Sequence, residues 1–220
     1  MLDYQQRLPT SHFYQLNEIM ELIFYLKPKK ILDIGTGFGK YGFLSREYLD
    51  IWGRQNHDYN EHYCIIDGIE VFEKYITPVH DYIYDNIYIG NAKDLLPTLD
   101  KKYDLILLID VLEHFDYDGG LKILSECKKV GRNIIISTPK DIGNQKGSRG
   151  NVFETHKFQW KKKHFEMYKK KFFVSNNKSL IYFIGEDAYK VRNNIKTSKS
   201  KIKAKFKQYF PSIYKLLGKN

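Results

Sequence analysis

Residues 103–110 read YDLILLID, and this run constrains the fold more than any other part of the chain. Successive side chains of a β-strand point to opposite faces of the sheet, so the five apolar residues 105–109 would make both faces hydrophobic. A strand of this kind is typical of the centre of a parallel sheet that helices cover on both sides. The sequence therefore predicts an open α/β architecture.

The remaining segments alternate between strand and helix patterns. Strands are expected at residues 30–34, 63–70, 86–90, 103–110 and 133–138, with two more forming a hairpin within 172–185. Helices are expected at residues 11–28 with Ser11 as N-cap, 39–49, 71–85 divided by Pro78, 119–130 and 159–171. This order predicts a mostly parallel sheet with one antiparallel strand near the edge and helices on both faces.

Charge divides the chain into two parts. The 220 residues carry a formal net charge of +10, yet residues 188–220 hold ten Lys or Arg and no Asp or Glu. Residues 1–187 therefore contain 26 basic and 26 acidic residues. We expect one folded domain over 1–187 and a basic tail over 188–220. A neutral body makes nucleic acid a less favoured partner, although residues 157–171 contain seven lysines and one glutamate.

Cysteine usage and hydropathy indicate a cytoplasmic protein. Cys64 and Cys127 form neither a disulfide framework nor a metal-binding CxxC pair. The first residues lack the pattern of a signal peptide, and the longest apolar run is too short to span a membrane.

A glycine-rich loop follows the first expected strand. Residues 31–42 read ILDIGTGFGKYG, with glycines at 35, 37, 39 and 42. Loops at the carboxyl ends of such strands bind ligands, and glycine lets backbone N–H groups approach them. A dinucleotide fingerprint would need glycine at position 40, where this chain has lysine. Asp33 favours a ligand with an ammonium group over one with a phosphate at this point.

These residues resemble motif I of the class I S-adenosylmethionine-dependent methyltransferases, and the resemblance covers most of 30–185. DGIE, ending at Glu70, is similar to the family's ribose-binding motif, and GNAKD is similar to its adenine-contacting turn, with Asn91 where the family often has Asp. YDLILLIDVLEHF is similar to the fourth motif, which lies beside the methionine moiety. The resemblance implies a Rossmann-like fold, S-adenosylmethionine as cofactor, and binding residues Asp33, Gly35, Thr36, Gly37, Gly39, Glu70, Val71, Asn91, Ala92, Asp110 and Val111.

Purely structural roles exist for each of these features. A glycine-rich turn can simply pack a helix on a strand, Glu70 can be a helix-start carboxylate, and Asp110 can be a helix N-cap. All of them would have to fall at one end of one sheet by chance, which favours the binding interpretation.

Candidate catalytic residues follow the fourth and fifth strands. Glu113 and His114 lie in the first of these loops, and Glu154, His156 and Trp160 in the second. Both loops should emerge at the same end of the sheet, and the polar loop 139–156 is expected to cover the acceptor as a lid. Trp160 has two interpretations, as a wall for a sugar or base and as a packing residue.

Two chemistries are open for this cluster. In one, His156 or His114 is a general base for the acceptor. In the other, Glu113, His114 and His156, with Asp110 as a further candidate ligand, hold a divalent cation, Mg²⁺ or Mn²⁺, that polarises the acceptor oxygen. DVLEH and THKFQW loosely resemble the metal motifs of small-RNA terminal 2′-O-methyltransferases, although Asp110 stands where those enzymes have Glu. VLEH also resembles ubiquinone-pathway O-methyltransferases. His114 can alternatively be a helix-start histidine bonded to the backbone.

The basic tail has an amphipathic pattern. Ile202, Phe206 and Phe210 fall on one helical face among lysines, and Ile213, Leu216 and Leu217 follow Pro211. This pattern predicts peripheral contact with an anionic membrane surface. A solvated tail and a helix docked on the domain are the alternatives.

The sequence as a whole predicts a cytoplasmic methyltransferase that acts on an oxygen of a small molecule or of a sugar or glycan precursor. A metal-dependent RNA 2′-O-methyltransferase is the alternative enzyme. A non-catalytic module that binds the cofactor is the alternative without chemistry.

Overall fold

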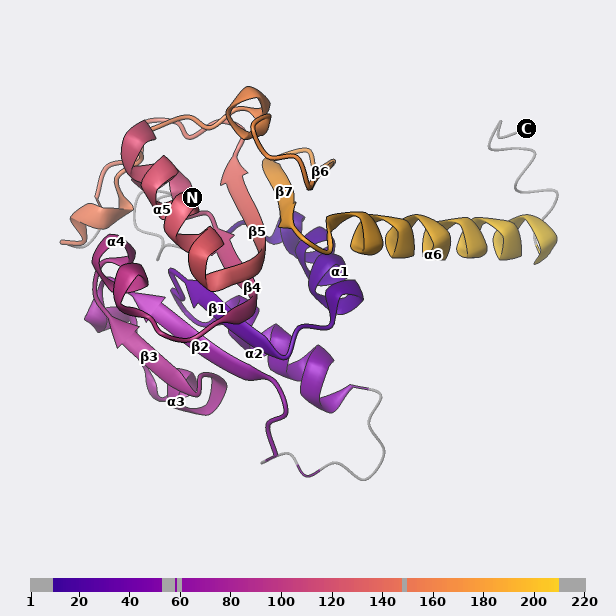
Figure 1. Cartoon of the computed structure of the whole chain (residues 1–220), viewed down its shortest axis with the longest axis horizontal. Helices are drawn as coiled ribbons and strands as arrows, with labels where there is room; N and C mark the ends of the chain where they lie inside the picture. The colour runs from indigo at the N-terminus through magenta and orange to yellow at the C-terminus, as the bar shows by residue number, and fades with distance from the viewer. Residues whose placement is uncertain (1–9, 53–57, 59–60, 148–149, 210–220) are drawn as a thin grey trace, which may run out of the picture.

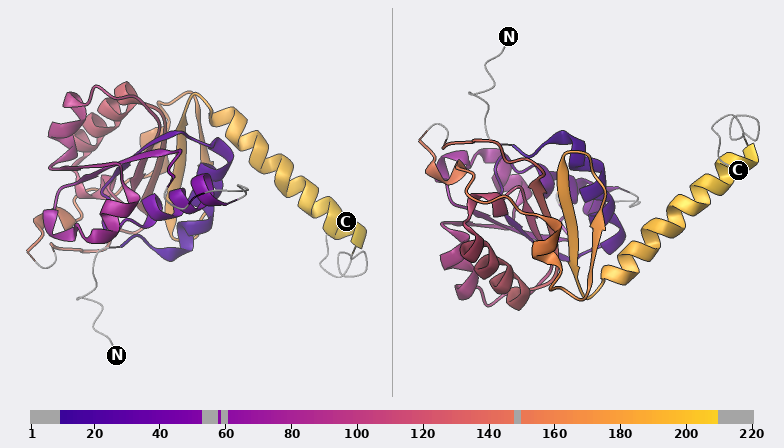
Figure 2. Two further views of the ribbon diagram at one scale, coloured as in Figure 1. Left: turned by 90° about the horizontal axis from the view of Figure 1, so that it is seen from below. Right: turned by 90° about the horizontal axis from the view of Figure 1, so that it is seen from above.

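A computed structural model describes residues 10–52, 58, 61–147 and 150–209. A seven-stranded sheet lies between two layers of helices (Figures 1 and 2), with strand order β3-β2-β1-β4-β5-β7-β6. The strands are β1 (Lys30–Ile34), β2 (Ile65–Glu70), β3 (Asn86–Ile89), β4 (Tyr103–Ile109), β5 (Gly131–Pro139), β6 (Lys171–Val174) and β7 (Ser179–Gly185). The α-helices are α1 (Leu16–Leu26), α2 (Lys40–Arg46), α3 (Pro78–Ile83), α4 (Ala92–Leu95), α5 (Tyr117–Val130) and α6 (Ala188–Tyr209).

The strand directions confirm the predicted α/β class. Strands β1 to β5 pair in parallel, and β7 lies antiparallel between β5 and β6. In the β5–β7 pair, Asn133 lies opposite Gly185 and Pro139 opposite Ser179. The carboxyl end of β5 is therefore level with the start of β7.

Strand β4 is apolar on both faces, as predicted. Ile106 and Leu108 pack in the core layer that α4 and α5 cover. Leu105, Leu107 and Ile109 pack in the opposite layer, which contains buried residues of α1, α3 and α6. The central strand thus contributes to both halves of the core.

Two helix predictions need correction. The first helix is not capped by Ser11: a 3₁₀ turn, Phe13–Gln15, precedes α1, and the His12 side chain accepts a hydrogen bond from the Tyr14 N–H. The expected helix over 159–171 is wrong, because only Lys162–Phe165 form a 3₁₀ turn. Trp160 and Phe165 are both fully buried, and in an α-helix they would point about 140° apart, so one could not reach the core.

Two other helical segments depart less from expectation. Pro78 divides the 71–85 segment as predicted, since a short 3₁₀ turn, Glu73–Tyr75, precedes α3 and Pro78 is its first residue. The helix expected over 39–49 is α2 followed by a π-helical turn, Glu47–Ile51.

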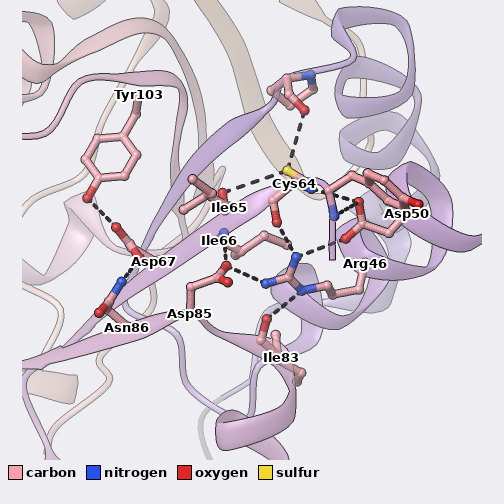
Figure 3. A network of polar contacts seen from close by, with 12 residues as sticks. Arg46, Asp50, Cys64, Ile65, Ile66, Asp67, Ile83, Asp85, Asn86 and Tyr103 are labelled. Carbon is pink, nitrogen blue, oxygen red and sulfur yellow. Dashed lines mark hydrogen bonds and ion pairs between the residues drawn. The ribbon is translucent and has the colours of Figure 1, made fainter. Parts of the chain in front are cut away.

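A buried ion-pair network joins α2 to the residues that immediately precede β2 and β3 (Figure 3). The Arg46 side chain is 2% exposed, and its guanidinium contacts Asp50 at 2.9 Å and Asp85 at 2.6 Å. It also donates to the backbone carbonyls of Ile83 and Cys64. The Arg46 side chain thereby links α2 to the turn that follows it, to the residue before β2 and to the end of α3.

Helix α6 begins in the core and leaves the domain (Figures 1 and 2). Ala188 and Val191 are fully buried and Ile195 is partly buried against the same core layer as α1. The first turns of α6 thus pack on the domain, although we expected residues 188–220 to form a tail outside it. Phe210, Ile213, Leu216 and Leu217 lie outside the described residues.

Within the described part of the chain, no helix combines the length and hydropathy needed to cross a membrane.

Candidate active site

A cavity of about 2000 Å³ opens at the carboxyl ends of β1, β2 and β4. Most of the residues singled out from the sequence line it: Asp33, Gly35, Thr36, Gly37, Glu70, Val71, Asn91, Ala92, Asp110, Val111, Glu113, His114, Glu154 and His156. The topology explains this convergence, because parallel strands end at the same edge of the sheet.

The glycine loop forms one wall of this cavity. Gly35 and Gly37 have φ values of +75° and +54°. Residues other than glycine rarely adopt this backbone conformation. A Cβ on Gly35 would lie 2.7 Å from the Val111 side chain, so this loop could not approach the end of β4 with a larger residue. Gly39 lies outside the cavity lining; it precedes α2 and faces Ile83 instead.

Glu70 lies at the end of β2 and holds the loop in place. It is 4% exposed, and one carboxylate oxygen accepts a hydrogen bond of 3.0 Å from the Gly37 N–H. The other oxygen accepts from the Phe72 N–H at 3.0 Å. A carboxylate has about four acceptor positions, so Glu70 can accept further hydrogen bonds from a ligand.

Asp33 lies deeper in the same wall. Its carboxylate accepts a hydrogen bond of 2.7 Å from the Tyr84 hydroxyl. Burial raises the pKa of Asp33 to about 7, the Tyr84 hydrogen bond opposes this change, and the charge of Glu70 adds to it. Nothing local in the sequence indicated Tyr84, which follows α3 and reaches Asp33 over Gly68 of β2.

We expect Asp33 to make the protein less stable as pH rises. In the folded state Asp33 keeps its proton up to about pH 7, whereas in the unfolded chain it releases the proton near pH 3.8. The contribution of Asp33 to the free energy of unfolding is therefore fully present below pH 3.8 and is lost as the pH rises to about 7. The loss should be on the order of 2–4 kcal/mol. Urea unfolding across this range, compared with Asp33→Asn, measures it. Parallel pH profiles for the two proteins would contradict the expectation.

Asp110 begins the segment that follows β4, in a left-handed conformation with φ of +54°. Its two carboxylate oxygens accept hydrogen bonds of 2.7 Å, one from the Ser137 hydroxyl and one from the Gln15 side-chain amide. Asp110 is therefore fixed on the cavity wall by β5 and by the residues before α1. Its side chain does not cap a helix.

The segment before α1 closes the cavity next to Asp110. The Lys40 ammonium donates to the Ser11 carbonyl at 2.5 Å and to the Ser11 hydroxyl at 3.1 Å. Gln15 is fully buried, although it lies in a stretch that we expected to be ordinary helix. No local pattern predicts these contacts, because they join residues far apart in the chain.

Glu113, His114 and His156 come together as predicted. Each offers one ligand atom, and these atoms lie within 4.8 Å of one another. The two loops are joined by backbone hydrogen bonds to the Glu113 carbonyl, from Lys157 N–H at 2.7 Å and Phe158 N–H at 3.3 Å. The cluster is thus held by main chain as well as by side-chain packing.

Backbone carbonyls orient both histidine rings. Nδ1 of His114 lies 3.3 Å from the Thr155 carbonyl, and Nδ1 of His156 contacts the Ile142 carbonyl. A carbonyl only accepts, so each Nδ1 carries the proton and each Nε2 keeps a lone pair. Burial and, to a smaller extent, the neighbouring His156 lower the pKa of His114 to about 4. His114 is therefore neutral near pH 7.

Glu113 supplies the carboxylate of the cluster and is buried. It is 1% exposed, and its Oε2 atom has no hydrogen-bond partner among the described residues. Burial raises its pKa well above the usual range, and the charge of Asp110 adds to this. An unpartnered buried oxygen beside two imidazole lone pairs fits a divalent cation, which would supply the missing partner.

Two other candidates are placed differently. Glu154 lines the cavity, and burial raises its pKa to about 7, with the charge of Glu70 adding to this. Trp160 is fully buried, and its indole N–H donates to the Leu112 carbonyl at 3.0 Å. Trp160 is therefore a packing residue, and the alternative in which it walls an acceptor is wrong.

Part of the polar loop that we expected to act as a lid lines the cavity. Residues 141–147 line it, together with Phe153 and Lys157. Lysines 161–163 and 169–171 of the basic segment are not among the lining residues.

No protein-family profile and no curated protein matches this chain. Solved structures do match. The N-terminal domain of EvdMO1 with SAH bound has a TM-score of 0.56 at 12% identity, covering 80% of this chain and 82% of that one. The methyltransferase domain of bacterial CtHen1 has a TM-score of 0.53 at 16% identity, covering 79% and 98%.

An O-methyltransferase family protein from Burkholderia thailandensis matches with a TM-score of 0.56 at 12% identity, covering 78% of this chain and 55% of that one. At such identities the likeness concerns the fold. This chain has the Rossmann-like fold of the class I methyltransferases.

Proposed function

We propose that this protein is an S-adenosylmethionine-dependent O-methyltransferase. The observation that carries the proposal is the arrangement of one cavity, with Asp33, Gly37 and Glu70 on one side and the cluster of Glu113, His114 and His156 on another. The cofactor would supply a methyl group bound to a sulfonium sulfur. The neutral thioether that remains after the transfer is an excellent leaving group. The protein's own tasks are therefore to position the acceptor and to take its proton.

The cofactor would lie along the glycine loop. Glu70 would accept hydrogen bonds from the ribose hydroxyls, and Asp33 would pair with the ammonium group. Asn91 and Ala92 would contact the adenine; the Asn91 Oδ1 atom already caps α4 by accepting from the Lys93 N–H at 3.0 Å, which fixes the side chain. Asp110 and Val111 would hold the methionine moiety. Gly35 and Thr36 would allow the close approach.

The histidine cluster would act on the acceptor. The lone pair on His156 Nε2 can take the acceptor's proton directly, with His114 Nε2 as a second acceptor. Alternatively, Glu113, His114 and His156 hold Mg²⁺ or Mn²⁺, which lowers the pKa of a coordinated hydroxyl. The unpartnered Glu113 Oε2 favours the metal version.

A small molecule or a sugar-like acceptor suits the polar lid. Asp141, Asn144 and Gln145 line the cavity and can hydrogen-bond hydroxyl groups. A structure similar to this chain, the N-terminal domain of EvdMO1, was determined in the presence of SAH and D-fucose. We therefore propose a small-molecule or sugar-like acceptor. We also propose that the protein acts in the cytoplasm.

A short RNA is the second candidate acceptor. The cluster is of a kind that can hold a metal, and Lys157 lines the cavity near the exposed lysines 161–163. A module that binds the cofactor without chemistry is the third interpretation.

Calorimetric titration with S-adenosylmethionine, S-adenosylhomocysteine and NAD tests the cofactor. We expect the first two to bind. If only NAD binds, the proposal is wrong.

Release of S-adenosylhomocysteine over a panel of sugars, catechols and short RNAs, with and without Mg²⁺ or Mn²⁺, then identifies the acceptor class. Cofactor binding with no turnover on any acceptor would favour the module without chemistry.

Glu70→Ala is expected to weaken cofactor binding by about 1.5–3 kcal/mol, because it removes a charged hydrogen-bond acceptor from the ribose site. Calorimetry with S-adenosylhomocysteine measures the change. Glu73→Ala is the matched control, since Glu73 is exposed and outside the cavity lining. A melting temperature recorded for each variant separates lost affinity from lost folding. Unchanged affinity would show that Glu70 only supports the glycine loop.

A further inference from the structure

Helix α6 extends from the domain as an arm that the methyltransferase proposal does not use. It comprises 22 residues, or about 33 Å at 1.5 Å per residue. Its sequence contains eight Lys or Arg and no Asp or Glu. Arg192, Lys196 and Lys203 are exposed, whereas Ala188 and Val191 are buried in the core.

By sequence position, the apolar residues of α6 form a stripe along one side of the helix, which is interrupted at Ser198 and Lys199. At 100° per residue, positions 188, 191, 195, 202, 206 and 209 all fall within an arc of about 60°. The residues at these positions are Ala188, Val191, Ile195, Ile202, Phe206 and Tyr209. The first three pack on the domain, and Tyr209, at the far end, is 69% exposed. The sequence therefore repeats, in the part of α6 that extends beyond the domain, the apolar side by which the helix attaches to it.

The arm leaves from the end of the sheet opposite the cavity. Gly185, which precedes α6, pairs with Asn133 near the amino end of β5, whereas Pro139 at the other end of β5 lines the cavity. Figures 1 and 2 show α6 running away from the 140–157 segment in each view. A ligand held by the far part of α6 would not reach His156 in the same molecule.

We propose that α6 binds the anionic surface of a lipid membrane and anchors the domain there. Lysines on both sides of an apolar stripe match such a surface, since the stripe enters the headgroup region while the ammonium groups meet lipid phosphates. Each lysine near an anionic bilayer strengthens binding by a factor of about five. Residues 1–187 carry no net charge, so the net positive charge that an anionic surface attracts lies in residues 188–220.

The same features disfavour other partners. A nucleic-acid acceptor would have to reach the cavity, which lies at the opposite end of the sheet. Nucleic-acid binding by charge also needs no apolar stripe. Self-association through α6 would bring two sets of eight positive charges together. An anchor attached opposite the cavity, in contrast, leaves the cavity mouth open to an acceptor.

Co-sedimentation of the full-length protein with vesicles tests the proposal. The expected result is binding to vesicles of equal parts phosphatidylglycerol and phosphatidylcholine, and none to phosphatidylcholine alone. Binding should weaken sharply as salt rises from about 0.1 M to about 0.5 M, because the charges are exposed. Equal binding to both kinds of vesicle, or to neither, would overturn the proposal.

Full-length variants locate the binding surface. Replacement of Lys199, Lys201, Lys203 and Lys205 by Gln should lower the partition coefficient by more than about 100-fold. The control replaces four exposed lysines of the body, Lys27, Lys29, Lys122 and Lys163, by Gln, and should change it little. Equal losses in the two variants would overturn the assignment to α6.

The apolar stripe has its own test. The double variant Ile202→Ser, Phe206→Ser keeps every charge. Its partition coefficient should still fall by about 10-fold or more, because it removes two apolar side chains that would insert into the headgroup region of the membrane. If this variant binds as the wild type does, and a single-stranded RNA competes the wild type off the vesicles, the arm is a nucleic-acid site instead. A cofactor titration on each variant confirms that the domain is folded.

Discussion

His156→Ala is expected to lower turnover by about 10²–10⁴-fold on the acceptor that the wild type methylates. His156 lies in the loop after β5 and is oriented by the Ile142 carbonyl, so its Nε2 lone pair faces the cluster. Removal of the ring takes away the proton acceptor in one version of the chemistry and a metal ligand in the other. Cofactor affinity should change little, because His156 is not part of the glycine-loop wall.

Steady-state release of S-adenosylhomocysteine measures this effect, and cofactor calorimetry confirms that the pocket is intact. His62→Ala is the matched control, since His62 is exposed and does not line the cavity. Full turnover by His156→Ala would eliminate both versions of the chemistry.

Glu113→Gln separates the two versions. A neutral amide is a poor metal ligand, so this variant should lose activity with the metal and recover part of it at high Mn²⁺ concentration. If His156 acts as a base without a metal, chelator should leave the wild type active. Activity that chelator removes and Mg²⁺ or Mn²⁺ restores would establish the metal version.

Arg46→Met is expected to destabilise the folded state by about 3–5 kcal/mol, because it leaves the buried Asp50 carboxylate without its cation. Asp50 is 1% exposed, and its other oxygen accepts from the Cys64 N–H at 2.9 Å. Asp85 loses the same partner, although it is one third exposed and still accepts from the Ile66 N–H. Most of the cost therefore comes from Asp50.

Urea denaturation at neutral pH measures this change in the free energy of unfolding. Arg132→Met is the control: Arg132 pairs with Asp187, but its side chain is 56% exposed, and loss of such a surface pair should change stability far less. Equal effects of the two substitutions would mean that the Arg46 network contributes no more than a surface ion pair. Adding Asp50→Leu to Arg46→Met should recover part of the loss, since no unpaired charge then remains at position 50.

The strands could be predicted because their signal is local. The five apolar residues 105–109 could only suit a strand covered on both faces, and β4 is such a strand. The meeting of Glu113, His114 and His156 could also be predicted, since it follows from two loops that end at one edge of a parallel sheet. These predictions needed periodicity and topology, and no knowledge of particular contacts.

The errors arose where tertiary packing outweighs local preference. Residues 159–171 contain residues that favour helix, yet Trp160 and Phe165 must both enter the core, and an α-helix cannot deliver them together. Gln15 and Tyr84 were missed for a related reason. Each reaches an aspartate distant in the sequence, at Asp110 and Asp33, and no spacing rule relates such pairs.

The position of β7 has a consequence for synthesis of the chain on the ribosome. Strand β5 is complete at Pro139, but its neighbour on one side, β7, begins only 40 residues later at Ser179. At translation rates of about 5–20 residues per second, the backbone edge of β5 waits roughly 2–8 s for its partner. That edge runs through Ile134, Ile135 and Ile136, so a nascent chain in this interval exposes an apolar strand able to pair with another chain. A ribosome that stalls between these points would hold the protein in its most aggregation-prone form.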